Sequence, residues 1–307
     1  MLTAEACRSA QRHLCSLVAL GALALTQSRC TPPELCVPRE SSFDFFSKGD
    51  CILTNAVFFQ GHEWITYFGN RDLSTTDRFS AEDLHHIAEG NRRVDWPKEL
   101  LVYLNTSPVH YYKKLTEHTN RPENQRLHFL LDDRNTSVEA AAQGVEAIRV
   151  ESELAVELWN VDRVAALTKV GRAQHTLQDS FSAAHTVRAP ERDWCLVKVK
   201  AYIPRAPGHD DPDLEFHGGD RNDEVGHTTV EDSIYRAGRD CHDPVGASQV
   251  EACLNDSALR AGKASRDHLE LIRQAVTERA AAGNDDAPSI SDTLFDQFAA
   301  KHLAFCE

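Results

Sequence analysis

The segment after Asp162 most constrains how this chain folds, because it is apolar on nearly all of its faces. One stripe at helical spacing contains Ala166, Val170, Ala173, Leu177 and Phe181. Asp162 is a suitable N-cap for the helix that these residues predict. A helix that is apolar nearly all round is normally a buried, central element. The pattern therefore favours an all-α protein with this helix at its centre.

Polar residues of the metal-ligand type interrupt this apolar helix. His175 and Asp179 are four residues apart, which places both side chains on one face, one turn apart. His185 follows just beyond the helix, and His227 and Glu231 repeat the four-residue step later in the chain. Imidazole nitrogens and carboxylate oxygens are common zinc ligands. Either pair alone is more typical of a solvated helix face, but both pairs on an apolar framework predict a multinuclear metal site.

Helical signals continue through most of the chain from residue 62 onward. Predicted helices cover 62–68, 98–104, 137–158, 227–238, 259–282 and 291–303, and another begins at the Ser80 capping box and ends at Gly90-Asn91. Asp95 is expected in the loop that follows, and 196–203 is a weak strand candidate. We expect a single multi-helix bundle domain over residues 58–307, with residues 186–226 as an insertion.

Residues 1–28 are predicted to be a signal peptide. Arg8, Arg12 and His13 precede an apolar run at 17–25, which is too short to span a bilayer but has the length of a signal-peptide core. Residues 29–57 are rich in Pro, Ser and Cys and are interpreted as an irregular linker. The leader predicts a secreted or periplasmic protein, and no transmembrane segment is expected. The alternative is a disordered leader that is not cleaved.

The charge balance of the chain bears on its partners. The formal net charge is -14, and such a field repels nucleic acid and anionic membrane surfaces. Stable nucleic-acid binding is therefore not expected, and we expect a monomer. A bound metal cluster reverses the sign locally, so this charge is compatible with a nuclease or a lipase.

The cysteines do not predict a structural zinc site, because none of the nine shows Cys-x-x-Cys spacing. Cleavage of the leader would remove Cys7 and Cys15 and leave an odd number, so at least one stays free or pairs between chains. Cys241 and Cys253 flank a short loop and are the pairing that the sequence favours.

The order and spacing of these groups resemble those of a known family, the zinc-dependent phospholipases C and the related single-strand-specific nucleases. The resemblance covers residues 61–240 and rests on Gly61-His62-Glu63-Trp64-Ile65-Thr66, Gly90-Asn91-Arg92-Arg93-Val94-Asp95, Leu127-His128-Phe129, His175-x3-Asp179-x5-His185 and Gly226-His227-x3-Glu231. The His-x3-Asp-x5-His element is fairly specific, whereas His62 and His128 carry little by themselves.

The resemblance implies a helical bundle that encloses a multinuclear zinc cleft with two or three ions. The implied ligands are His62 for an N-terminal ion, Asp95, His128 and His175 for another, Asp179 as the bridge between these two, and His185, His227 and Glu231 for the remaining ion. Without the resemblance, His62 could cap a helix, His128 could be a core histidine and Asp95 could be a turn residue.

Two features depart from the family pattern. Family members use the free amine and carbonyl of an N-terminal Trp as ligands, whereas here the first Trp is Trp64, after His62, and Val57 has the nearest equivalent spacing. We therefore expect the His62 site to be incomplete and two zinc sites to be secure. The gap from His185 to His227 is also longer than usual, which predicts a lid or extra ligands at His209 and His217 in the insertion.

The resemblance further implies hydrolysis of a phosphoric ester by a metal-activated water, with Asp95 as a ligand and as the acceptor of the water's proton. Glu at position 231 is usual in the phospholipases and Asp in the nucleases, so the predicted activity is that of a phospholipase C on phospholipid headgroups or other phosphodiesters. The alternatives are a single-strand-specific nuclease or nucleotidase of the same fold, and a secreted zinc-binding protein without catalysis.

Overall fold

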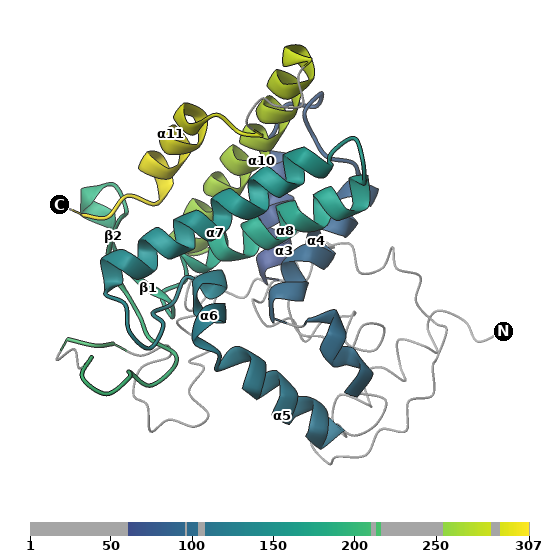
Figure 1. The fold of residues 1–307 in the computed structure, drawn as a ribbon. Helices are drawn as coiled ribbons and strands as arrows, with labels where there is room; N and C mark the ends of the chain where they lie inside the picture. The colour runs from purple at the N-terminus through teal and green to yellow at the C-terminus, as the bar shows by residue number, and fades with distance from the viewer. Residues whose placement is uncertain are drawn as a thin grey trace, which may run out of the picture.

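The fold is an all-α bundle, as the sequence predicts. The computed structural model describes residues 61–95, 97–103, 108–209, 213–215, 254–283 and 289–306. Its α-helices are α3 (Gly61–Arg71), α4 (Ala81–Asp95), α5 (Pro108–Thr119), α6 (Pro122–Gln125), α7 (Ser137–Leu158), α8 (Arg163–Asp179), α10 (Asp256–Ala282) and α11 (Asp292–His302) (Figure 1). Short 3-10 helices cover Lys98–Tyr103, Arg126–His128 and Pro190–Arg192. None of the described helices has the length and apolar character that crossing a membrane requires.

Helix α8 lies at the centre of the bundle, between α4, α7 and α10 (Figure 1). The Asp162 side chain accepts a hydrogen bond from the backbone N–H of Ala165 and so caps the helix as predicted. All five residues of the predicted apolar stripe, from Ala166 to Phe181, are buried. In the neighbouring helix α7 the cap is Thr136, one residue before the Ser137 cap that the sequence suggests, because Thr136 forms a capping box with Glu139.

Helices α4 and α8 approach closely through two interleaved glycines. A Cβ on Gly90 would overlap the backbone of Thr168, and a Cβ on Gly171 would overlap the carbonyl oxygen of Ile87 and lie 2.6 Å from the backbone nitrogen of Asn91. The prediction that Gly90-Asn91 ends the helix is therefore wrong, since Gly90 serves helix packing rather than a C-cap. Asp95 is the last residue of α4 instead of a loop residue.

A sharp turn after the 3-10 helix Arg126–His128 holds His128 against α8. Phe129 adopts a left-handed backbone conformation with φ 51°, which is unfavourable for a residue with a side chain. Its ring is fully buried against Gly144 of α7, so packing compensates for the strain. The Thr176 hydroxyl also donates a hydrogen bond of 2.8 Å to the Leu127 carbonyl. These contacts place the His128 side chain beside the C-terminal end of α8.

A two-stranded antiparallel sheet follows α8 directly and pairs β1 (Thr186–Ala189) with β2 (Cys195–Val199). The predicted strand at 196–203 overlaps β2, and the sequence did not predict β1. The N–H of Leu196 bonds to the carbonyl of Ala304, and the N–H of Cys306 bonds to the carbonyl of Leu196. The C-terminal segment thus runs beside β2, and a Cys195–Cys306 disulfide joins them with a Cα–Cα distance of 5.1 Å.

This disulfide is expected to contribute substantially to stability, because it links residues that are 111 positions apart. The Cys195→Ser/Cys306→Ser double variant should lose about 2–5 kcal/mol of unfolding free energy, measured by urea denaturation. Mass spectrometry of the oxidised and reduced wild-type protein checks that the bond forms. Denaturation midpoints that match between variant and wild type would contradict the prediction.

His268 of α10 is a fully buried core histidine between α7 and α8. Its Nε2 lies 2.8 Å from the Ser152 hydroxyl and its Nδ1 lies 2.8 Å from the Gln174 side-chain nitrogen. Burial lowers the pKa of His268 to about 3, so the imidazole is neutral in the folded protein above that pH. The two hydrogen bonds satisfy a neutral ring completely.

Acidification is expected to destabilise the protein through His268. The unfolded chain takes up a proton near pH 6.5, whereas the folded chain does not until about pH 3. The contribution of His268 to stability is therefore complete above pH 6.5 and is lost progressively as the pH falls toward 3. We expect the unfolding free energy of a His268→Gln variant, which keeps one donor and one acceptor, to fall less steeply over this range. Parallel slopes in pH-dependent denaturation would argue against it.

Several expectations lie outside the described residues. These are the signal peptide at 1–28, the linker at 29–57, the helix at 227–238, the Cys241–Cys253 pairing and the part of the 186–226 insertion beyond residue 215. Among the other helices, α10 begins three residues before its predicted start, at the Asn255 cap, and α11 begins after a Ser291 cap. His209, a predicted extra ligand, is exposed.

Candidate metal centre

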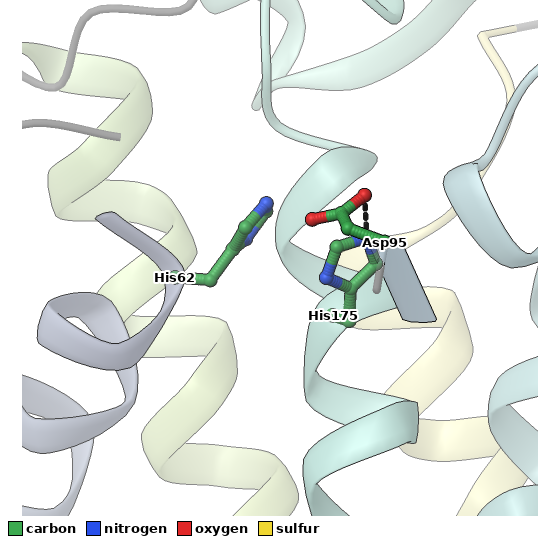
Figure 2. A group of neighbouring side chains, drawn as sticks. All are labelled: His62, Asp95 and His175. Atoms are coloured by element: carbon green, nitrogen blue, oxygen red, sulfur yellow. Dashed lines mark ion pairs between the residues drawn. The ribbon is translucent and has the colours of Figure 1, made fainter. Parts of the chain in front are cut away.

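Six of the eight predicted ligands converge in one buried cluster. Its members are His62 from α3, Asp95 from the end of α4, His128 from the 3-10 helix before the Phe129 turn, His175 and Asp179 from α8, and His185 from the loop after α8. All of these side chains are buried except that of Asp95, which is 20% exposed. Figure 2 shows His62 reaching in from α3 on one side, with His175 and Asp95 together on the other. Residues as far apart in sequence as 62 and 185 therefore share one site.

The separations between donor atoms fit a single small cation. The Nδ1 of His128 and the Nε2 of His175 lie 3.2 Å apart. The Oδ2 of Asp179 lies 3.4 Å from the former and 3.1 Å from the latter, and the Oδ1 of Asp95 lies 3.5 Å and 3.6 Å from the same two nitrogens. Ligand atoms placed tetrahedrally about 2.0–2.1 Å from zinc are separated by roughly 3.3 Å. Every separation here that involves an imidazole nitrogen is close to that value.

One oxygen of the Asp179 carboxylate accepts no hydrogen bond from the protein. Oδ2 is buried and makes no hydrogen bond, although the nitrogens of three imidazoles lie 3.1–3.7 Å away. The other oxygen, Oδ1, lies 3.1 Å from the Nε2 of His62. A buried carboxylate oxygen is costly unless a donor or a cation satisfies it. The two oxygens therefore face two different groups of donors, and the residues present fit a metal ion at this position.

Hydrogen bonds outside the cluster orient three of the imidazoles. The Nδ1 of His175 lies 3.0 Å from the Oδ1 of Asn91, and the Nδ1 of His62 lies 3.0 Å from the Oε1 of Gln178. The Nδ1 of His185 lies 2.6 Å from the carbonyl oxygen of His128. Because a carbonyl oxygen only accepts, each Nδ1 carries the hydrogen and each neutral ring has its lone pair on Nε2. This arrangement is typical of histidines that bind metals through Nε2.

The electrostatics of the cluster indicate a strongly negative potential. Burial opposes charge on His62, but the Asp179 carboxylate outweighs burial and raises the pKa of His62 to about 9. Burial is likewise overcome at His128, whose pKa is raised by Asp179, whereas burial lowers the pKa of His175. Burial opposes ionisation of Asp179, but the surrounding imidazoles hold its pKa well below the ordinary value. The carboxylates therefore favour positive charge at His62 and His128, and a divalent cation would supply such charge.

The donor sets can be read directly from the described residues. One set comprises His128, His175 and Asp179, and another comprises His62, Asp95 and His175, with the ligand atoms of each within 4.8 Å of one another. His185 adjoins the first set. Its expected partners His227 and Glu231 lie outside the described residues, so the third predicted ion is not tested.

Two site residues were not predicted from the sequence, namely Asn91 and Gln178. Asn91 was interpreted as part of a helix C-cap, yet it is buried and contacts His175. Gln178 is fully buried although it lies on the apolar central helix beside Asp179. An uncharged amide in an otherwise apolar helix, next to a ligand, was the signal that could have identified it.

Comparison with known proteins does not assign this chain to a family. No family model matches the chain, no curated protein matches its sequence, and no solved structure matches its fold.

Proposed function

We propose that this chain is a zinc-dependent phosphoric ester hydrolase of the phospholipase C type. The observation that carries the proposal is that the His128 and His175 nitrogens lie 3.2 Å apart and 3.1–3.6 Å from oxygens of Asp95 and Asp179, together with His62 on the second oxygen of Asp179. Nitrogen and carboxylate donors in this proportion suit zinc better than magnesium or calcium, which take mostly oxygen ligands. Adjacent divalent ions, when bound, activate water and neutralise charge on a phosphoryl group.

The protein's own groups have separate roles in this proposal. His128 and His175 would hold one ion through nitrogens that face one another, and Asp179 and His62 would help to hold a second ion. Asp95 is the cluster member that solvent reaches, at 20% exposure. It is therefore the residue placed to accept a proton from the attacking water, as well as to bind metal. The histidines are less exposed than Asp95, and in this proposal they serve as ligands.

The proposed substrate is a phosphodiester with an uncharged or zwitterionic partner group, such as phosphatidylcholine. The net charge of -14 repels polyanions, which disfavours long single-stranded DNA. The Cys195–Cys306 disulfide supports the export of the protein to an oxidising compartment, where such substrates are met.

The proposal is tested by measuring metal content and hydrolysis on the same preparation of purified protein. We expect at least two zinc ions per chain, release of phosphorylcholine from phosphatidylcholine, and loss of that activity after dialysis against a chelator. Zinc added back should restore activity. Hydrolysis of single-stranded DNA without lipid hydrolysis would identify the nuclease alternative. Zinc bound with neither activity would leave only a metal-binding role, and fewer than two ions with neither activity would overturn the proposal.

A further inference from the structure

Six polar side chains form a continuous network in the core between α3, α7, α8 and α10. They are Thr66, Ser152, Gln174, Gln178, Ser265 and His268, each 0–2% exposed. Polar groups are buried to this extent only when nearly all of their donors and acceptors are paired. The network begins 2.6 Å from a backbone carbonyl of α7 and ends at His62, a ligand of the proposed metal centre, and at Asn91.

At the α7 end of the network, the direction in which each hydrogen bond is donated is fixed. The Ser152 hydroxyl donates to the carbonyl of Ile148 at 2.6 Å, so its oxygen accepts from the Nε2–H of His268 at 2.8 Å. The Nδ1 of His268 then has a lone pair and accepts from the side-chain nitrogen of Gln174 at 2.8 Å. That nitrogen also donates to the carbonyl of Ser265 at 3.1 Å. The Gln174 oxygen is therefore directed toward Gln178.

The next step orients the amide of Gln178. Its nitrogen donates to the Oε1 of Gln174 at 3.1 Å and to the hydroxyl of Thr66 at 2.7 Å. The Thr66 hydroxyl uses its own hydrogen on the carbonyl of His62 at 3.0 Å, so it only accepts from Gln178. The Gln178 oxygen must therefore point the other way, where it lies 3.0 Å from the Nδ1 of His62 and 3.4 Å from the side-chain nitrogen of Asn91.

This orientation determines the tautomers of two ligands. Because the Gln178 oxygen only accepts, the hydrogen of a neutral His62 lies on Nδ1 and its lone pair on Nε2, 3.1 Å from Asp179. Asn91 donates its nitrogen to Gln178, so its oxygen faces the Nδ1 of His175 at 3.0 Å and leaves that ring's lone pair on Nε2. One amide thus sets both rings, directly in one case and through Asn91 in the other.

We propose that Gln178 is a positioning residue of the metal centre, which holds His62 and His175 in the tautomers that bind metal through Nε2. The inference rests on the proposed metal centre but not on the proposed hydrolysis. Outer-shell partners of this kind typically contribute 10–100-fold to metal affinity.

The test compares three variants of the full chain by zinc affinity, measured by competition with a chromophoric chelator. Gln178→Met has a similar volume but no acceptor, and should bind zinc roughly 10–100-fold more weakly. Gln178→Glu keeps an oxygen for His62 and Asn91 and should restore affinity to within a few-fold of wild type. Ser152→Ala is the matched control, because it removes buried hydrogen bonds at the far end of the same network while the Ser265 carbonyl, at 3.1 Å from the Gln174 nitrogen, still orients Gln174. It should lower the melting temperature and leave zinc affinity unchanged.

A spectroscopic readout separates positioning from general destabilisation. Long-range 1H–15N correlation spectra of the imidazoles report which ring nitrogen carries the hydrogen. We expect a single Nδ1–H tautomer for His62 and His175 in zinc-loaded wild type and Ser152→Ala, and mixed or shifted signals in Gln178→Met. If Gln178→Met does not fold, Asn91→Leu tests the His175 arm with the same measurements.

Two results would overturn the inference. One is an affinity and tautomer pattern in Gln178→Met that equal those of wild type. The other is a loss of affinity in Ser152→Ala as large as in Gln178→Met, which would assign the effect to stability. If the wild-type protein itself binds no zinc, the proposed centre fails and the inference fails with it. If zinc binds but no ester is hydrolysed, only the proposed function fails.

Discussion

Replacing Asp179 with Asn is expected to abolish hydrolysis and to remove zinc from the centre. The carboxylate presents one oxygen to His175 and His128 and the other to His62. An amide keeps the shape but loses the charge, and its nitrogen cannot bind a cation. Since outer-shell changes already cost 10–100-fold, the loss of a bridging ligand should reduce zinc affinity by more than about 100-fold. Metal analysis and lipid hydrolysis on the same sample measure both effects.

The matched control for this variant is Asp267→Asn. Asp267 of α10 is also an ionised carboxylate, with the Nζ of Lys301 at 2.6 Å and the Nε2 of His302 at 2.8 Å. Burial opposes its ionisation, but hydrogen bonds from these side chains help to hold its pKa below the ordinary value. Both partners lie in the last turn of α11, away from the cluster. We expect this control to lose stability but to keep its zinc. Full activity in Asp179→Asn would refute the bridging role.

Replacing Gly171 with Ala is expected to lower the stability of the fold substantially. The new methyl group would overlap the carbonyl of Ile87 and lie 2.6 Å from the backbone nitrogen of Asn91 and 2.9 Å from the Cα of Gly90. These are backbone atoms, which cannot move aside unless α4 and α8 separate. Overpacking of this kind typically costs 1–3 kcal/mol and occasionally more, so we expect a loss of about 3 kcal/mol. Urea denaturation measures it.

The same substitution should also weaken metal binding, because α4 carries Asn91 and Asp95 and α8 carries their partners His175 and Asp179. Gly262→Ala is the control, since a Cβ there would meet nothing within 4 Å and the residue is also helical. It should be neutral or stabilising by up to about 1 kcal/mol. A Gly171→Ala protein as stable as wild type, with normal zinc content, would show that the close approach of the two helices is not required.

The sequence predicted well those features that depend on local periodicity. The apolar stripe on α8 identified the central helix, and the four-residue step placed His175 and Asp179 on one face. Helix starts were predicted correctly where a side chain caps its own backbone, as at Ser80 and Asp162. These interactions involve neighbours in sequence, so a single chain contains all the information that they need.

The sequence-based predictions failed where the role of a residue depends on contacts with a distant part of the chain. Glycine is common at helix ends, but Gly90 lies inside α4 and is required for the close approach of α8 to α4. Cys195 and Cys306 are 111 residues apart, and no local pattern relates them. The strand β1 has too few residues to show periodicity and forms because β2 lies beside it.

The candidate site divides in the same way. The sequence by itself determined which residue types are present and that two of them share a helix face, because helical geometry follows from spacing alone. Only the tertiary structure decided that His62, Asp95 and His128 reach that face, and that Gln178 and Asn91 orient the rings. The physical reason is that imidazole nitrogens and carboxylate oxygens take up ligand spacing near 3.3 Å only when packing of separate helices fixes their positions.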